Sequence, residues 1–79
     1  MAIEPNDLRT KELLDRTGIS RQVLQHYIAV GLVKERDKTR TGRRLFGEEM
    51  VKRIKLIRKL NKSGYTLRDI RDVFKSGMR

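Results

Sequence analysis

The most distinctive polar side chains of this sequence lie between Arg21 and Val30. Placed at 100° intervals around a helix axis, these residues divide completely into two sides. The polar side holds Arg21, Gln22, Gln25, His26 and Ala29, and the apolar side holds Val23, Leu24, Tyr27, Ile28 and Val30. Arg and Gln can form bidentate hydrogen bonds with base edges in the major groove of DNA, and no acidic residue interrupts the polar side. This face is a candidate for reading bases. The alternatives are a solvated face of an ordinary amphipathic helix and, for His26, a neutral surface histidine.

A second candidate lies in the segment from Lys34 to Arg44, which is dominated by charged residues and has no apolar side chain. Such a segment cannot contribute to a core, so we expect a loop or an exposed hairpin tip. Its candidate phosphate ligands are Lys38, Arg40, Arg43 and Arg44. A solvated charged hairpin is the alternative.

Composition limits what these residues can do. The chain has 79 residues and a net charge of +10, which suits one small domain with a polyanionic partner. The absence of cysteine and the single histidine, His26, argue against disulfides, a metal site and any cofactor. No apolar run approaches the length of a membrane span and the start lacks the pattern of a signal peptide, so we expect a cytoplasmic protein without a membrane partner.

The positive charge is distributed unevenly. The segment 1–19 has three basic and four acidic residues. The segment 20–47 has seven basic and two acidic residues, and the segment 48–79 has ten basic and four acidic residues. The excess therefore begins at Ser20, and we expect the first helix to take no part in the basic surface.

The elements that position these residues follow from local signals. A first helix is expected to end near Arg16, with Asn6-Asp7 or Thr10 as its N-cap. Gly18 can close that helix in the left-handed conformation and Ser20 can cap the next, which stops at Gly31. Two helices joined by a three-residue turn containing Gly form the helix-turn-helix pattern.

The remainder predicts a wing and two more helices. Leu32-Val33 and Leu45-Phe46 suit two short strands around a turn at Arg40-Thr41-Gly42. Periodicity then predicts two helices, whose inward residues are Met50, Val51, Ile54, Ile57 and Leu60, then Leu67, Ile70, Val73 and Phe74, with Thr66 as the second N-cap. The predicted fold class is mainly α, a winged helix-turn-helix with a short two-stranded wing and two further helices. Its parts are the helix-turn-helix at 7–31, the wing at 32–46 and helices at 48–63 and 66–76, within one domain at 1–79.

Three short motifs occur in order along the chain. They are Gly18-Ile19-Ser20 with Leu24-Gln25-His26-Tyr27 and Gly31-Leu32-Val33, then Gly42-Arg43-Arg44-Leu45-Phe46 with Gly47-Glu48-Glu49, then Gly64-Tyr65-Thr66-Leu67-Arg68-Asp69-Ile70. From about Thr10 to Phe74 the chain thus resembles the N-terminal DNA-binding domain of MerR-family transcription regulators. The resemblance implies a winged helix-turn-helix that binds double-stranded DNA.

The resemblance also implies roles for individual residues. Tyr27 and Arg44 match positions that the family uses near the DNA backbone, and Ser20, at the helix start, is a further backbone candidate. Tyr27 also lies on the apolar side, so a place in the core is equally open. Gln22, Gln25 and His26 depart from the Arg, Arg and Tyr that are common in the family, so the family's base contacts do not carry over.

Full-length members of the family continue into a helix that pairs two subunits and then into an effector domain. Because the sequence stops at Arg79, we expect either a DNA-binding domain cut from a longer protein or a small stand-alone member, with effector and dimerisation regions absent. A homodimer would form through a region not present in this chain.

The leading functional hypothesis is sequence-specific binding of double-stranded DNA by a transcription regulator. An excisionase-like recombination accessory factor is the alternative, since such proteins also resemble this winged fold and are often as short. A basic adaptor for an acidic protein or an anionic membrane is the alternative of another class. An enzyme is not expected, because no nucleophile with a base, no phosphate-binding glycine loop and no inward pair of carboxylates stands out.

Overall fold

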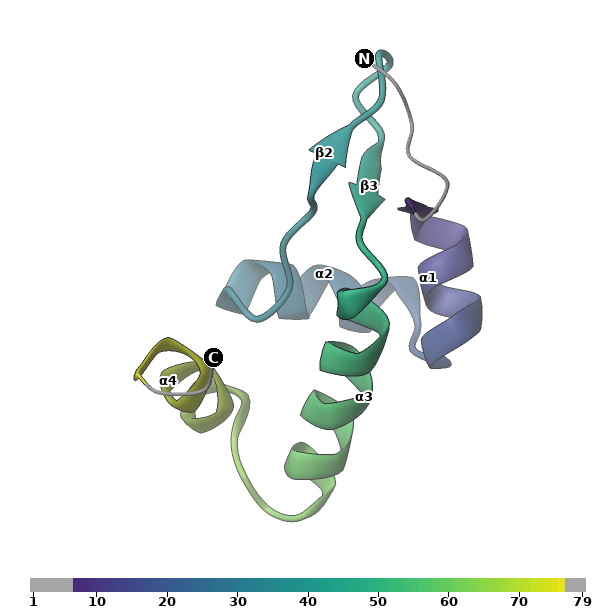
Figure 1. The fold of residues 1–79 in the computed structure, drawn as a ribbon. Coiled ribbons are helices and arrows are strands. Elements are labelled where there is room, and N and C mark those ends of the chain that lie inside the picture. Colours follow the sequence, from purple (N-terminus) through teal and green to yellow (C-terminus); the bar gives the residue numbers. More distant parts are fainter. Residues whose placement is uncertain (1–6, 77–79) are drawn as a thin grey trace.

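The computed structural model describes residues 7–76, which form four helices and three short strands around one core (Figure 1). In chain order these are β1 (Leu8–Arg9), α1 (Thr10–Thr17), α2 (Arg21–Val30), β2 (Asp37–Lys38), β3 (Arg44–Phe46), α3 (Glu49–Lys62) and α4 (Leu67–Ser76). The predicted mainly helical class is confirmed, and the four predicted helices are all present.

The helix-turn-helix forms as the local signals predict. Gly18 ends α1 with a φ of 78°, and its N–H donates to the carbonyl of Leu14 at 2.8 Å. Ser20 then caps α2, since its Oγ accepts the N–H of Val23 at 3.1 Å. Gly31 ends α2 with a φ of 93°, a left-handed conformation that glycine adopts without strain. Both ends of α2 are therefore fixed by side chains or turns that the sequence specifies.

The prediction for the start of α1 is wrong. The helix begins at Thr10, which is its first helical residue and not its cap, and Asn6 lies outside the described residues. The two residues before it form β1 instead, because Leu8 pairs with Phe46 across the sheet and is only 6% exposed. The backbone N–H of Arg9 donates to Oε1 of Glu12 at 3.1 Å, which ties the strand to the first turn of the helix.

The wing is a hairpin of β2 and β3, and β1 makes the sheet three-stranded, a strand more than predicted. All pairings are antiparallel, in the order β1-β3-β2, with Arg9 opposite Leu45 and Lys38 opposite Arg44. The turn lies at residues 40–42, as predicted, where the N–H of Gly42 donates to the carbonyl of Thr39 at 2.9 Å. Through β1, the base of the wing is joined directly to the start of α1.

The predicted strand at Leu32-Val33 is wrong. These residues follow α2 as irregular chain, and the N–H of Leu32 donates to the carbonyl of Tyr27 at 2.9 Å. Both are buried, at 1% and 3% exposed, so their apolar character reflects packing under the end of α2.

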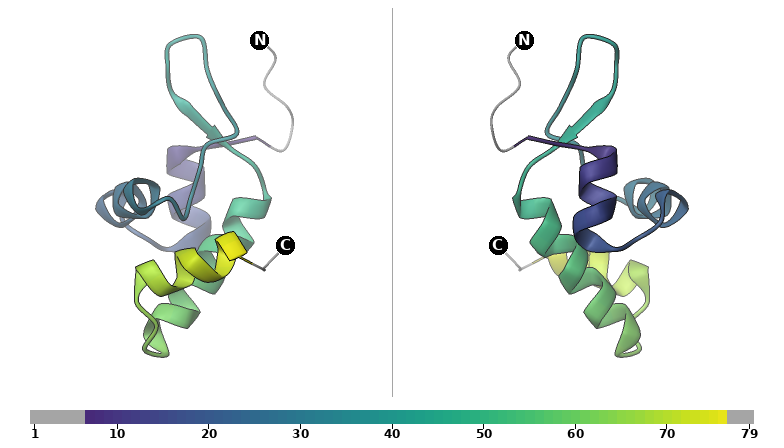
Figure 2. Two further views of the ribbon diagram at one scale, coloured as in Figure 1. Left: turned by 90° about the vertical axis from the view of Figure 1, so that its left-hand side faces the viewer. Right: turned by 90° about the vertical axis from the view of Figure 1, so that its right-hand side faces the viewer.

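The core lies between the helices and the base of the sheet. Helix α1 packs against α3, and α4 packs against both α2 and α3. The tip of the wing extends away from this body, at the end opposite the α3–α4 connection (Figures 1 and 2). The core is made by Leu8, Leu13, Ile19, Leu24, Tyr27, Leu32, Val33, Phe46, Val51, Ile54, Ile57 and Ile70.

The apolar stripes of α3 and α4 largely match their prediction. Ile54, Ile57 and Ile70 are at most 1% exposed, but Val73 is 47% exposed and does not point inward as predicted. Thr66 caps α4 as predicted, because its Oγ1 accepts the N–H of Asp69 at 3.0 Å.

Candidate nucleic-acid interface

Helix α2 presents its polar face to solvent. All five residues predicted for that face are exposed, namely Arg21, Gln22, Gln25, His26 and Ala29. The opposite face holds the helix against the core, with Leu24 only 1% exposed. Val23 was placed on the apolar side by the helical wheel, but it is 37% exposed and lies with the polar residues at the surface. The outer face of α2 therefore offers hydrogen-bonding groups together with one aliphatic side chain.

Tyr27 belongs to the core. It is 5% exposed, and burial raises the pKa of its hydroxyl above the ordinary value of 10.0, an effect that the nearby positive charge of Arg58 reduces. The hydroxyl therefore stays protonated at neutral pH. Tyr27 also lines two shallow depressions beside α2, which it shares with Val23 and Asn61.

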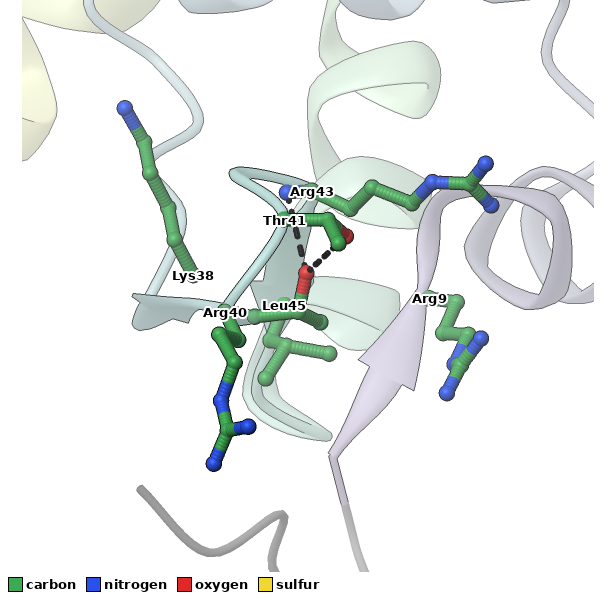
Figure 3. Close-up of a pocket in the computed structure, with 7 residues that line it drawn as sticks. Arg9, Lys38, Arg40, Thr41, Arg43 and Leu45 are labelled. Atoms are coloured by element: carbon green, nitrogen blue, oxygen red, sulfur yellow. Dashed lines mark hydrogen bonds between the residues drawn. The ribbon is translucent and has the colours of Figure 1, made fainter.

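The wing is stiffened at its tip by threonine. Oγ1 of Thr39 accepts the N–H of Arg43 at 3.1 Å and lies 3.1 Å from Oγ1 of Thr41 (Figure 3). Around this tip, Lys38, Arg40 and Arg43 point in three different directions, and Arg43 extends toward the side of the sheet where β1 lies (Figure 3). The wing cations therefore do not form a single surface.

Glu35 forms ion pairs with two of the four wing cations. Its carboxylate lies 3.8 Å from Nζ of Lys38 and 3.4 Å from Nε of Arg44. Arg40 and Arg43, by contrast, are exposed and form no ion pair with any residue in the described part of the chain. Of the four predicted phosphate ligands, these two carry uncompensated charge, while Lys38 and Arg44 share theirs with Glu35.

A groove of about 610 Å³ separates the wing from α2. It is lined by Arg9, Thr10, Lys11, Arg21, Gln25, Gly42, Arg43 and Arg44. Five of these residues are cationic and none is acidic. A smaller hollow of about 270 Å³ on the wing shares Arg9 and Arg43 with it. The groove brings together four predicted site residues from α2 and the wing, namely Arg21, Gln25, Arg43 and Arg44.

The sequence interpretation missed Arg9 and Lys11. It excluded the first helix from the basic surface because residues 1–19 have no net positive charge. The nearby carboxylates have other partners: Glu12 accepts the N–H of Arg9, and Asp7 pairs with Arg36. The start of α1 thus belongs to the basic surface, contrary to the prediction. The pairing of β1 with β3 and the packing of α1 against β3 bring these two cations to the wing.

Three observations on the described residues concern metal binding and membrane contact. Over 7–76, no group of histidine and acidic side chains is arranged to hold a metal ion. No helix in that range is long and apolar enough to cross a membrane. The apolar residues of α3 that would be needed for an amphipathic anchor, Val51, Ile54 and Ile57, are buried in the core.

Two helices in a helix-turn-helix, a β-hairpin wing beside the second helix and a cationic groove between them define a winged helix-turn-helix domain. The model of the MerR HTH family of regulatory proteins matches residues 8–77, nearly the whole chain. The chain belongs to this family, which consists of DNA-binding transcription regulators and not of enzymes.

Relatives agree with this assignment. The chain is 31% identical over 62 residues to the mercuric resistance operon regulatory protein of Bacillus cereus. The matched region covers 78% of this chain and 47% of that protein. It is 36% identical over 63 residues to the nodulation protein NolA of Bradyrhizobium elkanii, and this match covers 80% of this chain and 29% of that protein. A crystal structure of a MerR-family transcriptional regulator from Bacillus cereus matches the fold with a TM-score of 0.79 at 19% identity, covering 92% of this chain and 55% of that one. The chain spans about half or less of the length of the curated relatives it matches.

Proposed function

We propose that this chain binds double-stranded DNA sequence-specifically, as the DNA-binding domain of a transcription regulator. In this proposal α2 enters the major groove and the wing lies on the neighbouring phosphate backbone. The observation that carries it is the polar face of α2, free of acidic residues, next to a groove with five cations and no carboxylate. Phosphate contacts set the position of such a domain, and base contacts provide its specificity.

The roles divide between the two elements. Arg21, Gln22, Gln25 and His26 are the base-reading residues. Val23, exposed among them, adds an apolar group suited to a thymine methyl. The backbone contacts come from Ser20, Lys38, Arg40, Arg43 and Arg44.

Ser20 can combine two tasks. Its Oγ accepts the N–H of Val23, which leaves its own O–H to donate to a phosphate oxygen. Tyr27 contributes mainly by packing, since it is 5% exposed.

A tight complex needs a second copy. One domain offers few phosphate contacts and about four base-reading residues, so it should bind weakly, and two domains on a two-fold site would bind much more tightly. We propose that dimerisation, where it occurs, uses a region outside this chain.

The test begins with duplexes selected from a random pool by the purified chain. Gln25→Ala should change the preferred sequence, because it removes one base-reading side chain. Arg43→Ala should weaken binding to every sequence and reduce the slope of log K against log salt by about 1. Arg44→Ala should act the same way with a smaller effect, because Glu35 already shares its charge.

The matched control is Lys52→Ala, which removes an exposed cation from the first turn of α3, a helix with no residue among those that line the groove. It should leave both affinity and preference unchanged. Equal losses on every sequence from Gln25→Ala and Arg43→Ala would contradict the division of roles. Strong binding to anionic vesicles without preference among duplexes would contradict the function itself.

A further inference from the structure

We infer that the groove between α1, α2 and the wing is a binding site for one DNA backbone phosphate, held by Arg9 and Lys11. This inference rests on the proposed function and extends it to an element other than α2 and the wing. It assigns the start of α1 a direct part in binding DNA.

The first argument is charge. The five cations of the groove have no carboxylate among the residues that line it with them. Within residues 7–76, neither Arg9 nor Lys11 forms an ion pair, and both are exposed. Of the carboxylates nearby in sequence, Glu12 accepts the backbone N–H of Arg9 and Asp7 pairs with Arg36, and neither lines the groove. Like charges brought together without a counter-ion repel each other, so the groove is suited to an anion.

The second argument is position. Gln25 of α2 lines one side of the groove, and Gly42 and Arg43 of the wing line the other. A DNA strand contacted by both α2 and the wing has to pass between these two contacts, and its phosphates then face the groove. The volume of about 610 Å³ leaves room for a phosphate group with its sugar. The chemical class of the ligand is therefore a phosphodiester of the same duplex that α2 reads.

The third argument is rigidity. Arg9 lies opposite Leu45 in the β1–β3 pairing, and Lys11 lies in the first turn of α1. The backbone under both cations thus belongs to regular structure, whereas Arg40 lies in the turn of the wing. Cations on rigid elements lose less backbone entropy when they bind, which favours a fixed contact over a diffuse one.

The experiment compares the wild-type chain with the double variant Arg9→Gln/Lys11→Gln on the selected duplex. Glutamine keeps the helix propensity of Lys11 and a polar stem while it removes the charge. We expect binding to weaken on specific and non-specific duplexes alike, and the salt slope to fall by about 1, because the variant no longer neutralises that one phosphate. Sequence preference should not change.

A scan of the duplex with single methylphosphonates, which are uncharged, identifies the phosphate. We expect one position where the substitution weakens the wild-type chain but has no effect on the double variant. The matched control, Lys52→Gln/Lys55→Gln, removes two exposed cations from α3 and should retain the sensitivity of the wild-type chain at every position. Thermal unfolding of both variants checks that they fold.

The outcomes separate the two proposals. If the double variant keeps the salt slope of the wild-type chain and its sensitivity at every phosphate, this inference is overturned while the proposed function stands. If both double variants lose the same affinity, the effect is one of net charge and the inference is again overturned. If the wild-type chain shows no sequence preference but the double variant still loses salt slope, the specific function fails and the phosphate site stands.

Discussion

The α3–α4 pair and the groove beside the wing are both rich in cations, but the structure uses these cations differently. In the α3–α4 pair, the guanidinium of Arg53 lies 4.5 Å from the centre of the Phe74 ring. Nη1 of Arg58 donates to the carbonyl of Thr17 at 2.7 Å, which ties α3 to the end of α1. In the groove, Arg9, Lys11 and Arg43 are exposed and have no such partners among the described residues.

This difference shows that net charge alone does not locate a binding surface. By count, residues 48–79 hold ten basic and four acidic residues, and residues 1–19 hold three and four. The count therefore favours the C-terminal half and excludes the N-terminal segment. The contacts change this assignment, because Arg53 and Arg58 of α3 support the fold, whereas the cations of the groove lie together with no carboxylate among the residues that line it.

The largest effect on stability is expected at Arg58. Arg58→Ala removes a charged donor from the carbonyl of Thr17 and also removes packing by the side-chain stem. We expect the free energy of unfolding to fall by about 1.5–3 kcal/mol. Urea unfolding measures this loss directly.

Lys59→Ala is the matched control, because Lys59 is the next residue on α3 and is exposed. It should change stability by less than about 0.5 kcal/mol. Equal effects of the two substitutions would contradict the structural role assigned to Arg58. The α3–α4 pair would then not differ from the groove in how this arginine is used.

The helices could be predicted because their signals are local. Gly18, Ser20, Gly31 and Thr66 end or cap helices where the sequence places them. Val73 shows the limit of such signals, since it fits the apolar stripe of α4 by spacing but is about half exposed. Helical periodicity tells which residues share a face, while burial depends on what packs against that face.

The sheet and the groove could not be predicted in the same way. Strand β1 has only two residues, so it has no detectable alternation, and its pairing with β3 joins distant parts of the chain. The same pairing brings Arg9 and Lys11 to the wing, which is why the sequence located the face of α2 but not the complete groove. Leu32 is the opposite case, where an apolar pair that resembles a strand serves to cover the end of α2.

A smaller effect is expected from two helix caps, Ser20 at the start of α2 and Thr66 at the start of α4. Ser20→Ala and Thr66→Ala each remove a side-chain acceptor from the first turn of a helix, α2 and α4 respectively. Each should lower the free energy of unfolding by about 1 kcal/mol. Their effects on DNA should differ, because only Ser20 adjoins the face that we propose to bind DNA.

At a temperature where both variants are folded, Ser20→Ala should weaken binding to the selected duplex and Thr66→Ala should not. Fluorescence anisotropy with labelled duplex, after thermal unfolding curves, measures both quantities. A loss of affinity in Thr66→Ala as large as in Ser20→Ala would show that α4 takes part in binding, and the two regions would no longer differ in function.

The smallest effect concerns an ion pair that joins α1 to the residue before α3. Nη2 of Arg16 donates to Oε1 of Glu48 at 3.0 Å, and both side chains are nearly half exposed. This hydrogen bond, together with the positive charge of Arg16, lowers the pKa of Glu48 below its ordinary value of 4.5. A carboxyl group whose pKa is lower in the folded chain than in the unfolded chain stabilises the fold at pH values above the unfolded-state pKa. That contribution is lost as the pH falls through the folded-state pKa.

Glu48→Gln should therefore lower the Tm slightly at pH 7, since exposed ion pairs contribute little. The difference in Tm from the wild-type chain should shrink below about pH 4.5, as the wild-type carboxyl also loses its charge. In an Arg16→Gln background the same substitution should show a much weaker dependence on pH, because the partner that lowers the pKa is gone. A difference in Tm that stays constant down to pH 2.5 would mean that Glu48 supports the fold by packing and not by charge. The charge of Arg16 would then not stabilise the fold. In this respect Arg16 would resemble the exposed cations of the groove and not the arginines of α3 that support the fold.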